Sequence, residues 1–246
     1  TVDFNNLRLQ FDNSLILGEQ GIQQAQDVLT KMESRTWVEN RSEQILEAKL
    51  KLDELNNGYH ALIGMIEQAK SFVRQGDFRS AERILNSFQA GKESKWPDWL
   101  LIQKENAVNQ VHDLRAKYAL IQSRFVKEES GTGQVIEDVN QVLNPRNTDS
   151  SKIFGLSNEL AQYKTILERE IKVDPETNPY VLQINYLLGL LNWVESSSDT
   201  INGMGLRGSE LSLDAIYATR KIGKDFFEKT PAGLEGIQPG FAARNK

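Results

Sequence analysis

The chain has 246 residues, of which 39% are hydrophobic and 26% charged, and its net charge is −5. A chain of this length can bury a large core without covalent or metal cross-links, and the absence of cysteine excludes disulfides, zinc ribbons and thiol catalysis. Residues 1–130 carry 17 basic and 19 acidic side chains and residues 131–246 carry 12 and 15, so neither half is typical of a nucleic-acid-binding module.

The most apolar stretch of the chain runs from Tyr180 to Val194 and is interrupted by Asn185 and Asn192. A membrane-spanning helix needs about 18–20 consecutive apolar residues. The sequence therefore predicts a soluble protein without a membrane span. The lack of cysteine fits a secreted or virion-associated protein slightly better than a cytosolic one, and the compartment stays open.

The first part of the chain carries apolar residues at alternating spacings of three and four, which is the period of an amphipathic helix. Between residues 4 and 32 this stripe contains one extra four-residue step and predicts a single helix of about 45 Å, since each residue adds about 1.5 Å. The members of the stripe are Phe4, Leu7, Phe11, Leu15, Gly18, Ile22, Ala25, Leu29 and Met32.

Two further stripes follow the same rule, from Ile45 to Val73 and from Leu100 to Phe125. The first of them holds the alternation through four heptads without a break, and the second is interrupted only by Lys104. Such seams need partner helices that pack at a shallow angle. The sequence therefore predicts three long helices in residues 3–129.

A regularly spaced set of small and apolar residues runs from the end of the second long helix into the segment that follows it. Its residues are Ala69, Phe72, Gly76, Phe78, Ala81 and Leu85. This spacing is similar to that of one tetratricopeptide repeat unit, and the resemblance implies two helices joined by a turn at Gly76. No second copy follows, and repeat arrays need about three stacked units, so we expect a single helix-turn-helix with the same kind of packing. Trp96-Pro97-Asp98-Trp99 is typical of the start of the next helix.

The second half of the chain is more broken, with helices predicted at 135–143, 153–167, 179–202 and 211–227 between loops rich in turn residues. Residues 230–246 form a tail rich in proline and glycine, for which composition alone favours disorder. Where such a tail is ordered, something must hold it. The apolar anchors would be Ile237 and Phe241, against the chain's own helices or a neighbouring subunit.

The basic residues of the C-terminal part outnumber the acidic ones. From residue 220 onward the chain has six basic residues and three acidic ones. The basic residues are Arg220, Lys221, Lys224, Lys229, Arg244 and Lys246, and the acidic ones are Asp225, Glu228 and Glu235. A basic end of this kind is usually a solvated surface. The alternative is an acidic or phosphorylated partner, which makes Arg244 a candidate contact.

Gly205-Leu206-Arg207-Gly208-Ser209 lies between two predicted helices and resembles the arginine loop of bacterial toxin domains that activate small GTPases. The resemblance implies that Arg207 could neutralise charge in a partner's phosphoryl-transfer site. The alternative reading is an ordinary solvent-exposed loop arginine.

No constellation of residues suited to catalysis is found. His60 and His112 are the only histidines, and neither lies in a spacing typical of metal ligands or of a nucleophilic triad, so no cofactor is expected. Four tryptophans occur near helix ends or in the apolar helix at 180–194, where aromatic side chains usually close the ends of a helical bundle. They are Trp37, Trp96, Trp99 and Trp193.

We therefore expect an all-α protein built on an elongated bundle of long antiparallel, coiled-coil-like helices in residues 1–130, with a short helix-turn-helix insertion near 76–97. Shorter helices in residues 131–229 would pack on it, followed by the tail 230–246. The expected function is that of a non-enzymatic structural or assembly protein, such as a virion, filament or secretion-apparatus component, that binds copies of itself or neighbouring proteins. The alternative is a helical adaptor or regulator, including a GTPase-activating protein acting through Arg207.

Overall fold

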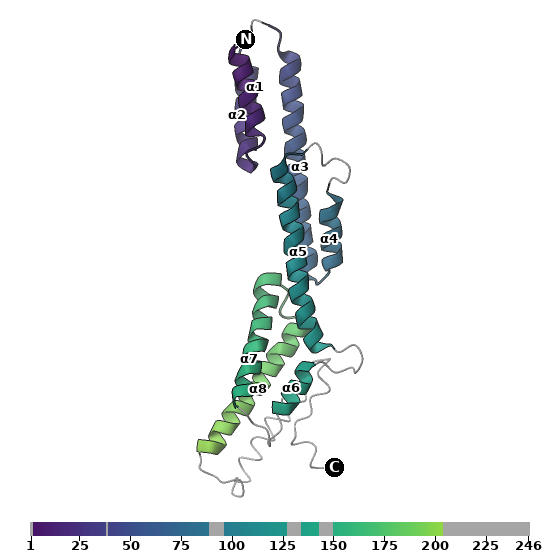
Figure 1. Ribbon diagram of the computed structural model, residues 1–246, viewed down its shortest axis with the longest axis vertical. Helices are drawn as coiled ribbons and strands as arrows, with labels where there is room; N and C mark the ends of the chain where they lie inside the picture. Colours follow the sequence, from purple (N-terminus) through teal and green to yellow (C-terminus); the bar gives the residue numbers. More distant parts are fainter. Residues whose placement is uncertain (1, 38, 89–95, 127–133, 143–149, 204–246) are drawn as a thin grey trace. The chain divides into compact units, whose positions relative to one another are not determined.

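The computed structural model describes residues 2–37, 39–88, 96–126, 134–142 and 150–203 (Figure 1). Within these ranges the chain folds into helices joined by turns, without a strand, which confirms the predicted all-α class. None of the described helices is long and apolar enough to cross a membrane. The chain divides into two compact units, Thr1–Asp113 and Leu114–Lys246, and helix α5 (Asp98–Phe125) contributes residues to both.

The first apolar stripe forms two helices instead of one. Helix α1 (Val2–Ser14) and helix α2 (Glu19–Ser34) pack against each other, so the prediction of a single long helix is wrong. The chain reverses at Gly18, whose φ of 83° lies in the region that glycine adopts without steric cost. The reversal also needs Gly21, because a Cβ atom there would lie 1.9 Å from the carbonyl oxygen of Ser14.

Helices α1 and α2 share one core with the first half of helix α3 (Ser42–Arg74). The buried side chains from α1 and the following turn are Phe4, Leu7, Phe11 and Leu15, those from α2 are Ala25, Val28, Leu29 and Met32, and those from α3 include Ala48, Leu52 and Leu55. Trp37 closes one end of this core: its ring meets that of Phe4 edge-on at 5.0 Å, and its Nε1 donates a hydrogen bond to the carbonyl oxygen of Met32 at 2.9 Å. This is the role predicted for a tryptophan near a helix end.

Helix α3 is continuous over the whole of the predicted second seam and ends in a turn that reverses the chain into helix α4 (Phe78–Ser87). Gly76, with φ of 77°, donates to the carbonyl oxygen of Val73, and Asp77 donates to that of Phe72, both at 2.9 Å. These two bonds make a Schellman motif, which requires a left-handed residue at the glycine position. The carboxylate of Asp77 then caps α4 by accepting a hydrogen bond from the backbone N–H of Ser80, which lowers the pKa of Asp77.

Helices α3 and α4 pack against each other through the small and apolar residues of the predicted helix-turn-helix. Ala69, Val73, Phe78, Ala81 and Leu85 are all buried. The hairpin therefore forms where the tetratricopeptide-like spacing implies it.

The second unit contains the end of α5, helix α6 (Gln134–Val142), helix α7 (Ser150–Thr165) and helix α8 (Pro179–Gly203). A π-helical turn, η2 (Ile166–Ile171), continues α7, which packs along α8 and also contacts α6. Before α8 the side chain of Asn178 accepts hydrogen bonds from the backbone N–H groups of Tyr180 and Val181, an N-cap that fits the proline at the first helical position. The last predicted helix, 211–227, lies outside the described residues.

Candidate functional site

In the first unit, aromatic residues join the middle of α3 to the start of α5. Trp96 lies just before α5 and is 8% exposed. Its ring lies directly over Gly58 of α3, where a Cβ atom would be only 2.2 Å from Cη2 and 2.3 Å from Cζ3. The lack of a side chain at Gly58 is therefore what admits the indole, although Gly58 is not a member of the predicted seam.

Trp99 completes this contact from the first turn of α5. Its Nε1 donates to the carbonyl oxygen of Leu15 at 3.0 Å, and its ring lies 5.9 Å from that of Tyr59. Burial, together with a hydrogen bond to Glu19 and the negative charge of that carboxylate, raises the pKa of Tyr59. We call Gly58, Tyr59, Trp96 and Trp99 the aromatic junction.

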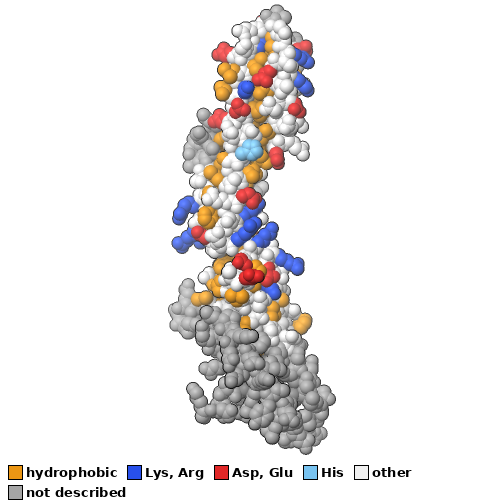
Figure 2. Space-filling view, turned by 180° about the vertical axis from the view of Figure 1, so that it is seen from behind, with side chains coloured by type: hydrophobic (Ala, Val, Ile, Leu, Met, Phe, Trp, Pro, Cys, Tyr) orange, Lys and Arg blue, Asp and Glu red, His pale blue; other side chains and the backbone are white. Residues whose placement is uncertain are grey.

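Exposed aliphatic side chains lie close in the sequence to Leu15 and Trp99, the two residues that the indole hydrogen bond joins. Ile16 and Leu17 follow Leu15 and are 66% and 60% exposed, and Ile102, one turn after Trp99, is 54% exposed. Other large hydrophobic residues also reach the surface, among them Leu46 and Leu50 of α3. The space-filling view shows hydrophobic side chains at the surface between the charged ones (Figure 2).

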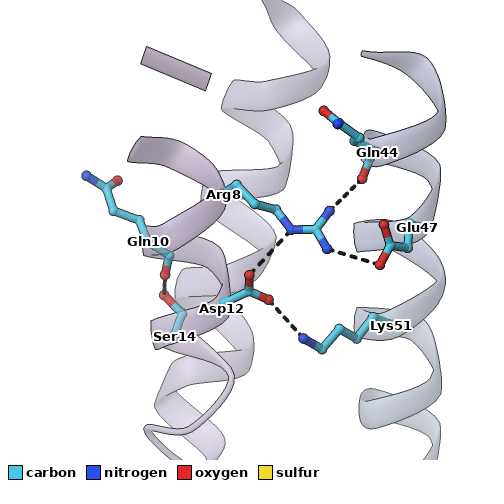
Figure 3. Close-up of polar contacts among 7 residues, drawn as sticks. All are labelled: Arg8, Gln10, Asp12, Ser14, Gln44, Glu47 and Lys51. Carbon is cyan, nitrogen blue, oxygen red and sulfur yellow. Dashed lines mark hydrogen bonds and ion pairs between the residues drawn. The ribbon is translucent and has the colours of Figure 1, made fainter. Parts of the chain in front are cut away.

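A charged cluster joins α1 to α3 (Figure 3). The guanidinium of Arg8 lies 3.4 Å from the carboxylate of Asp12 and 3.2 Å from that of Glu47, and it also donates to the carbonyl oxygen of Gln44. Asp12 in turn pairs with Lys51 at 2.8 Å. The pairs Arg8 to Glu47 and Asp12 to Lys51 have the same sequence separation of 39 residues, so α1 and α3 run parallel.

A second charged cluster lies in the other unit and connects α5, α6 and α7. Arg124 binds the carboxylate of Glu159 through Nε and Nη2, at 2.7 and 2.9 Å, and Nη2 also lies 2.9 Å from Asp138. Tyr163 donates a hydrogen bond to Glu159 at 2.7 Å. The hydrogen bond to Glu159 is the main reason that the pKa of Arg124 is raised. Burial disfavours the charged form of Glu159, but the bonds from Arg124 and Tyr163 outweigh that effect and lower its pKa.

The two histidines occupy separate places. The ring of His60 lies 5.5 Å from that of Tyr59, and Nε2 of His112 lies 3.6 Å from the carboxylate of Glu82. In the part of the chain that the structure describes, no group of three or more histidine, aspartate or glutamate residues could hold a metal ion.

The four partner-binding residues chosen from the sequence lie outside the described residues. They are Arg207, Ile237, Phe241 and Arg244. The side chain of Trp193 is also outside the described part. Sequence reasoning missed the exposed aliphatic residues close to Leu15 and Trp99. Their signal is the run Leu15-Ile16-Leu17 directly before a turn glycine, since turns are usually polar.

The chain matches none of the protein-family models, curated proteins or solved structures with which it was compared.

Proposed function

We propose that this chain is a non-enzymatic assembly protein that associates with copies of itself or with neighbouring proteins through the outward faces of its helices. The observation that carries the proposal is the pair Leu46 and Leu50 on α3, which are 56% and 60% exposed. They lie four residues apart and hence on one face, whereas Ala48 and Leu52, also four residues apart, are buried in the core on the other face. The helix is thus apolar on both sides.

The charges near this leucine pair support the proposal, because several of them are engaged within the chain. Glu47 and Lys51 pair with Arg8 and Asp12 of α1, and Lys49 lies 3.8 Å from Glu33 of α2. These pairs hold three helices to one another. They leave the two leucines as the apolar part of the outward face of α3.

The chemistry of the polar clusters agrees with a structural role. Arg8 pairs with Asp12 of its own helix and Glu47 of α3, and Arg124 pairs with Asp138 of α6 and Glu159 of α7, so each cation links helices to one another. We further propose that the long seam of α3 packs in a coiled-coil-like manner. Side-by-side association of such helices would use the same spacing again.

The test is the mass of the protein in solution, measured over a range of concentrations by light scattering or sedimentation. The intact chain is expected to form a larger species as the concentration rises. Leu46→Ser combined with Leu50→Ser should shift the chain toward the monomer. The mass of a chain that lacks residues 230–246 is measured in the same way, to test separately whether the tail contributes to assembly.

The matched control is Leu120→Ser, because Leu120 of α5 is exposed to a similar extent, 57%. It should leave the assembly unchanged. An intact chain that stays monomeric at every concentration, and is unaffected by the truncation, would contradict self-association.

A further inference from the structure

The turn between α1 and α2 presents two large aliphatic side chains to solvent in a fixed conformation. Leu15 is buried, its carbonyl oxygen accepts the hydrogen bond from Trp99, and the backbone N–H of Leu17 donates to the carbonyl oxygen of Ser14 at 3.0 Å. Ile16 and Leu17 therefore lie exposed in a turn that is held by hydrogen bonds from Leu17 and to Leu15. Exposed aliphatic residues in such a turn do not serve its geometry, which Gly18 provides.

The same hydrogen bond joins this turn to the first turns of α5, where Ile102 is also exposed. We call Ile16, Leu17 and Ile102 the aliphatic patch. Three aliphatic side chains that are each more than half exposed offer roughly a few hundred Å² of apolar surface, the size at which a patch on a monomer is often functional.

Carboxylates accompany the aliphatic patch. Asp98 and Glu105 lie four residues before and three residues after Ile102, on the same face of α5, and both are exposed. Glu19 follows the turn directly and is exposed as well. Lys104, the nearest cation in the sequence of α5, is half-buried and lies off this face. Three exposed carboxylates thus lie within one turn, along the chain, of the aliphatic patch.

From the size and charge of this surface we propose that the aliphatic patch binds a basic amphipathic helix of a partner protein. Helices of this type insert aliphatic anchors spaced three or four residues apart, and their lysine or arginine residues would face Glu19, Asp98 and Glu105. This inference rests on the proposed function, since it supplies the chemistry of one neighbouring protein.

A second copy of the chain fits this surface less well. Two copies docked patch to patch would bring their acidic residues together, which is unfavourable. The patch is also smaller than the roughly 800 Å² per partner that a stable dimer buries. One helix with a few anchors matches both its charge and its size.

The test measures binding of a fluorescently labelled peptide by anisotropy, with the full-length chain. The probe is a helical peptide with leucine on one face and lysine on the other. Two controls are a shuffled peptide of the same composition and a peptide with glutamate in place of lysine. We expect only the leucine–lysine helix to bind, with an affinity that falls as salt is added.

The decisive variant combines Ile16→Ser, Leu17→Ser and Ile102→Ser, all at exposed positions, with folding checked by circular dichroism. It should weaken binding roughly tenfold or more. Leu9→Ser with Leu120→Ser is the matched control, because these side chains are 61% and 57% exposed and have no part in either proposed surface. That control should bind the peptide like the intact chain.

Three results would overturn the proposal: no binding of the leucine–lysine helix, equal binding of the shuffled peptide, or unchanged binding by the triple variant. A fourth result would identify a different binding partner for the patch. If the triple variant abolishes self-association of the intact chain, the patch contacts a second copy instead. Self-association that depends on Leu46 and Leu50 without peptide binding would leave the proposed function standing and reject only this inference.

Discussion

Aromatic rings pack at both ends of α5, but among the residues that the structure describes only the second end also carries a charged cluster. At its start Trp99 and the preceding Trp96 bind through ring packing and one hydrogen bond to a backbone carbonyl, whereas near its end Arg124 binds two carboxylates. The first anchor depends on shape, since Gly58 must lack a side chain. The second depends on charge, so the two ends should respond differently to substitution, salt and pH.

Comparison with Arg8 predicts that the strength of a charged cluster depends on the burial of its carboxylates as well as on that of the arginine. The side chains of Arg8 and Arg124 are 23% and 22% exposed, which is nearly equal. The carboxylates differ: Asp12 and Glu47 are 39% and 67% exposed, whereas Asp138 and Glu159 are 33% and 30% exposed. Arg124 also binds Glu159 in the two-pronged geometry that is strongest for a guanidinium.

The largest effect is expected for Arg124→Ala. It leaves Glu159 and Asp138 partly buried without their cation, which for fully buried pairs costs about 3–5 kcal/mol. Because these groups keep some solvent contact, we expect a loss of about 2–3 kcal/mol in the free energy of unfolding. Urea denaturation followed by circular dichroism measures it.

The matched variant Arg8→Ala removes an arginine of the same exposure and should cost less than about 1 kcal/mol, because its partners are more exposed. Equal losses for the two variants would show that burial of the arginine, and not of its carboxylates, sets the strength of such a cluster.

The next effect concerns the aromatic anchor and uses two glycines of α3. In Gly58→Ala the new Cβ would overlap ring atoms of Trp96, whereas a Cβ at Gly64 meets no other atom within 4 Å. Gly64→Ala should stabilise the helix by about 0.5–1 kcal/mol, since alanine is the better helix former. Gly58→Ala gains the same amount but forces an overpacked ring to move, at about 1–3 kcal/mol.

We therefore expect the free energies of unfolding of these two glycine variants to differ by about 2 kcal/mol, with Gly58→Ala the less stable. Its tryptophan fluorescence should change as well. Similar stability in both variants would mean that the indole is not seated firmly on Gly58.

The apolar spacing predicted the helices well where one helix carries one continuous seam. The stripe from Ile45 to Val73 coincides with α3, and that from Leu100 to Phe125 coincides with α5. It failed between Phe4 and Met32, because two helices of a hairpin each have an apolar face and the stripe happens to keep its phase across the turn. Gly18 fitted the stripe as a small residue, although it serves as the reversal point.

The candidate sites could be predicted only in part, because their partners are distant in the sequence. The positions of the tryptophans near helix ends predict packing contacts there, and Trp37 and Trp99 each donate a hydrogen bond to a backbone carbonyl oxygen. Nothing local marks Gly58 as the seat of Trp96. Arg124 likewise binds residues 14 and 35 positions away, and only the folded chain brings those carboxylates to one guanidinium.

The smallest expected effect is the pH dependence of the charged cluster at Arg124, which the contact between Gly58 and Trp96 should lack. The bonds from Arg124 and Tyr163 hold the pKa of Glu159 below its ordinary value of 4.5. A carboxyl whose pKa is lowered by folding stabilises the protein above its unfolded pKa, and that contribution is lost as the pH falls through the folded value. Glu159→Gln should therefore cost about 1 kcal/mol at neutral pH and progressively less in acid below pH 4.5.

Urea denaturation of the native chain and Glu159→Gln at a series of pH values measures this difference, with Gly58→Ala as the comparison. The cost of Gly58→Ala arises from a steric contact between uncharged groups, so it should not change over the same range of pH. If the cost of Glu159→Gln is also constant with pH, the charged anchor of α5 acts through packing, as the aromatic one does. A cost that falls only for Glu159→Gln would show that charge contributes to the contacts near the end of α5 and not to the contact between Gly58 and Trp96 at its start.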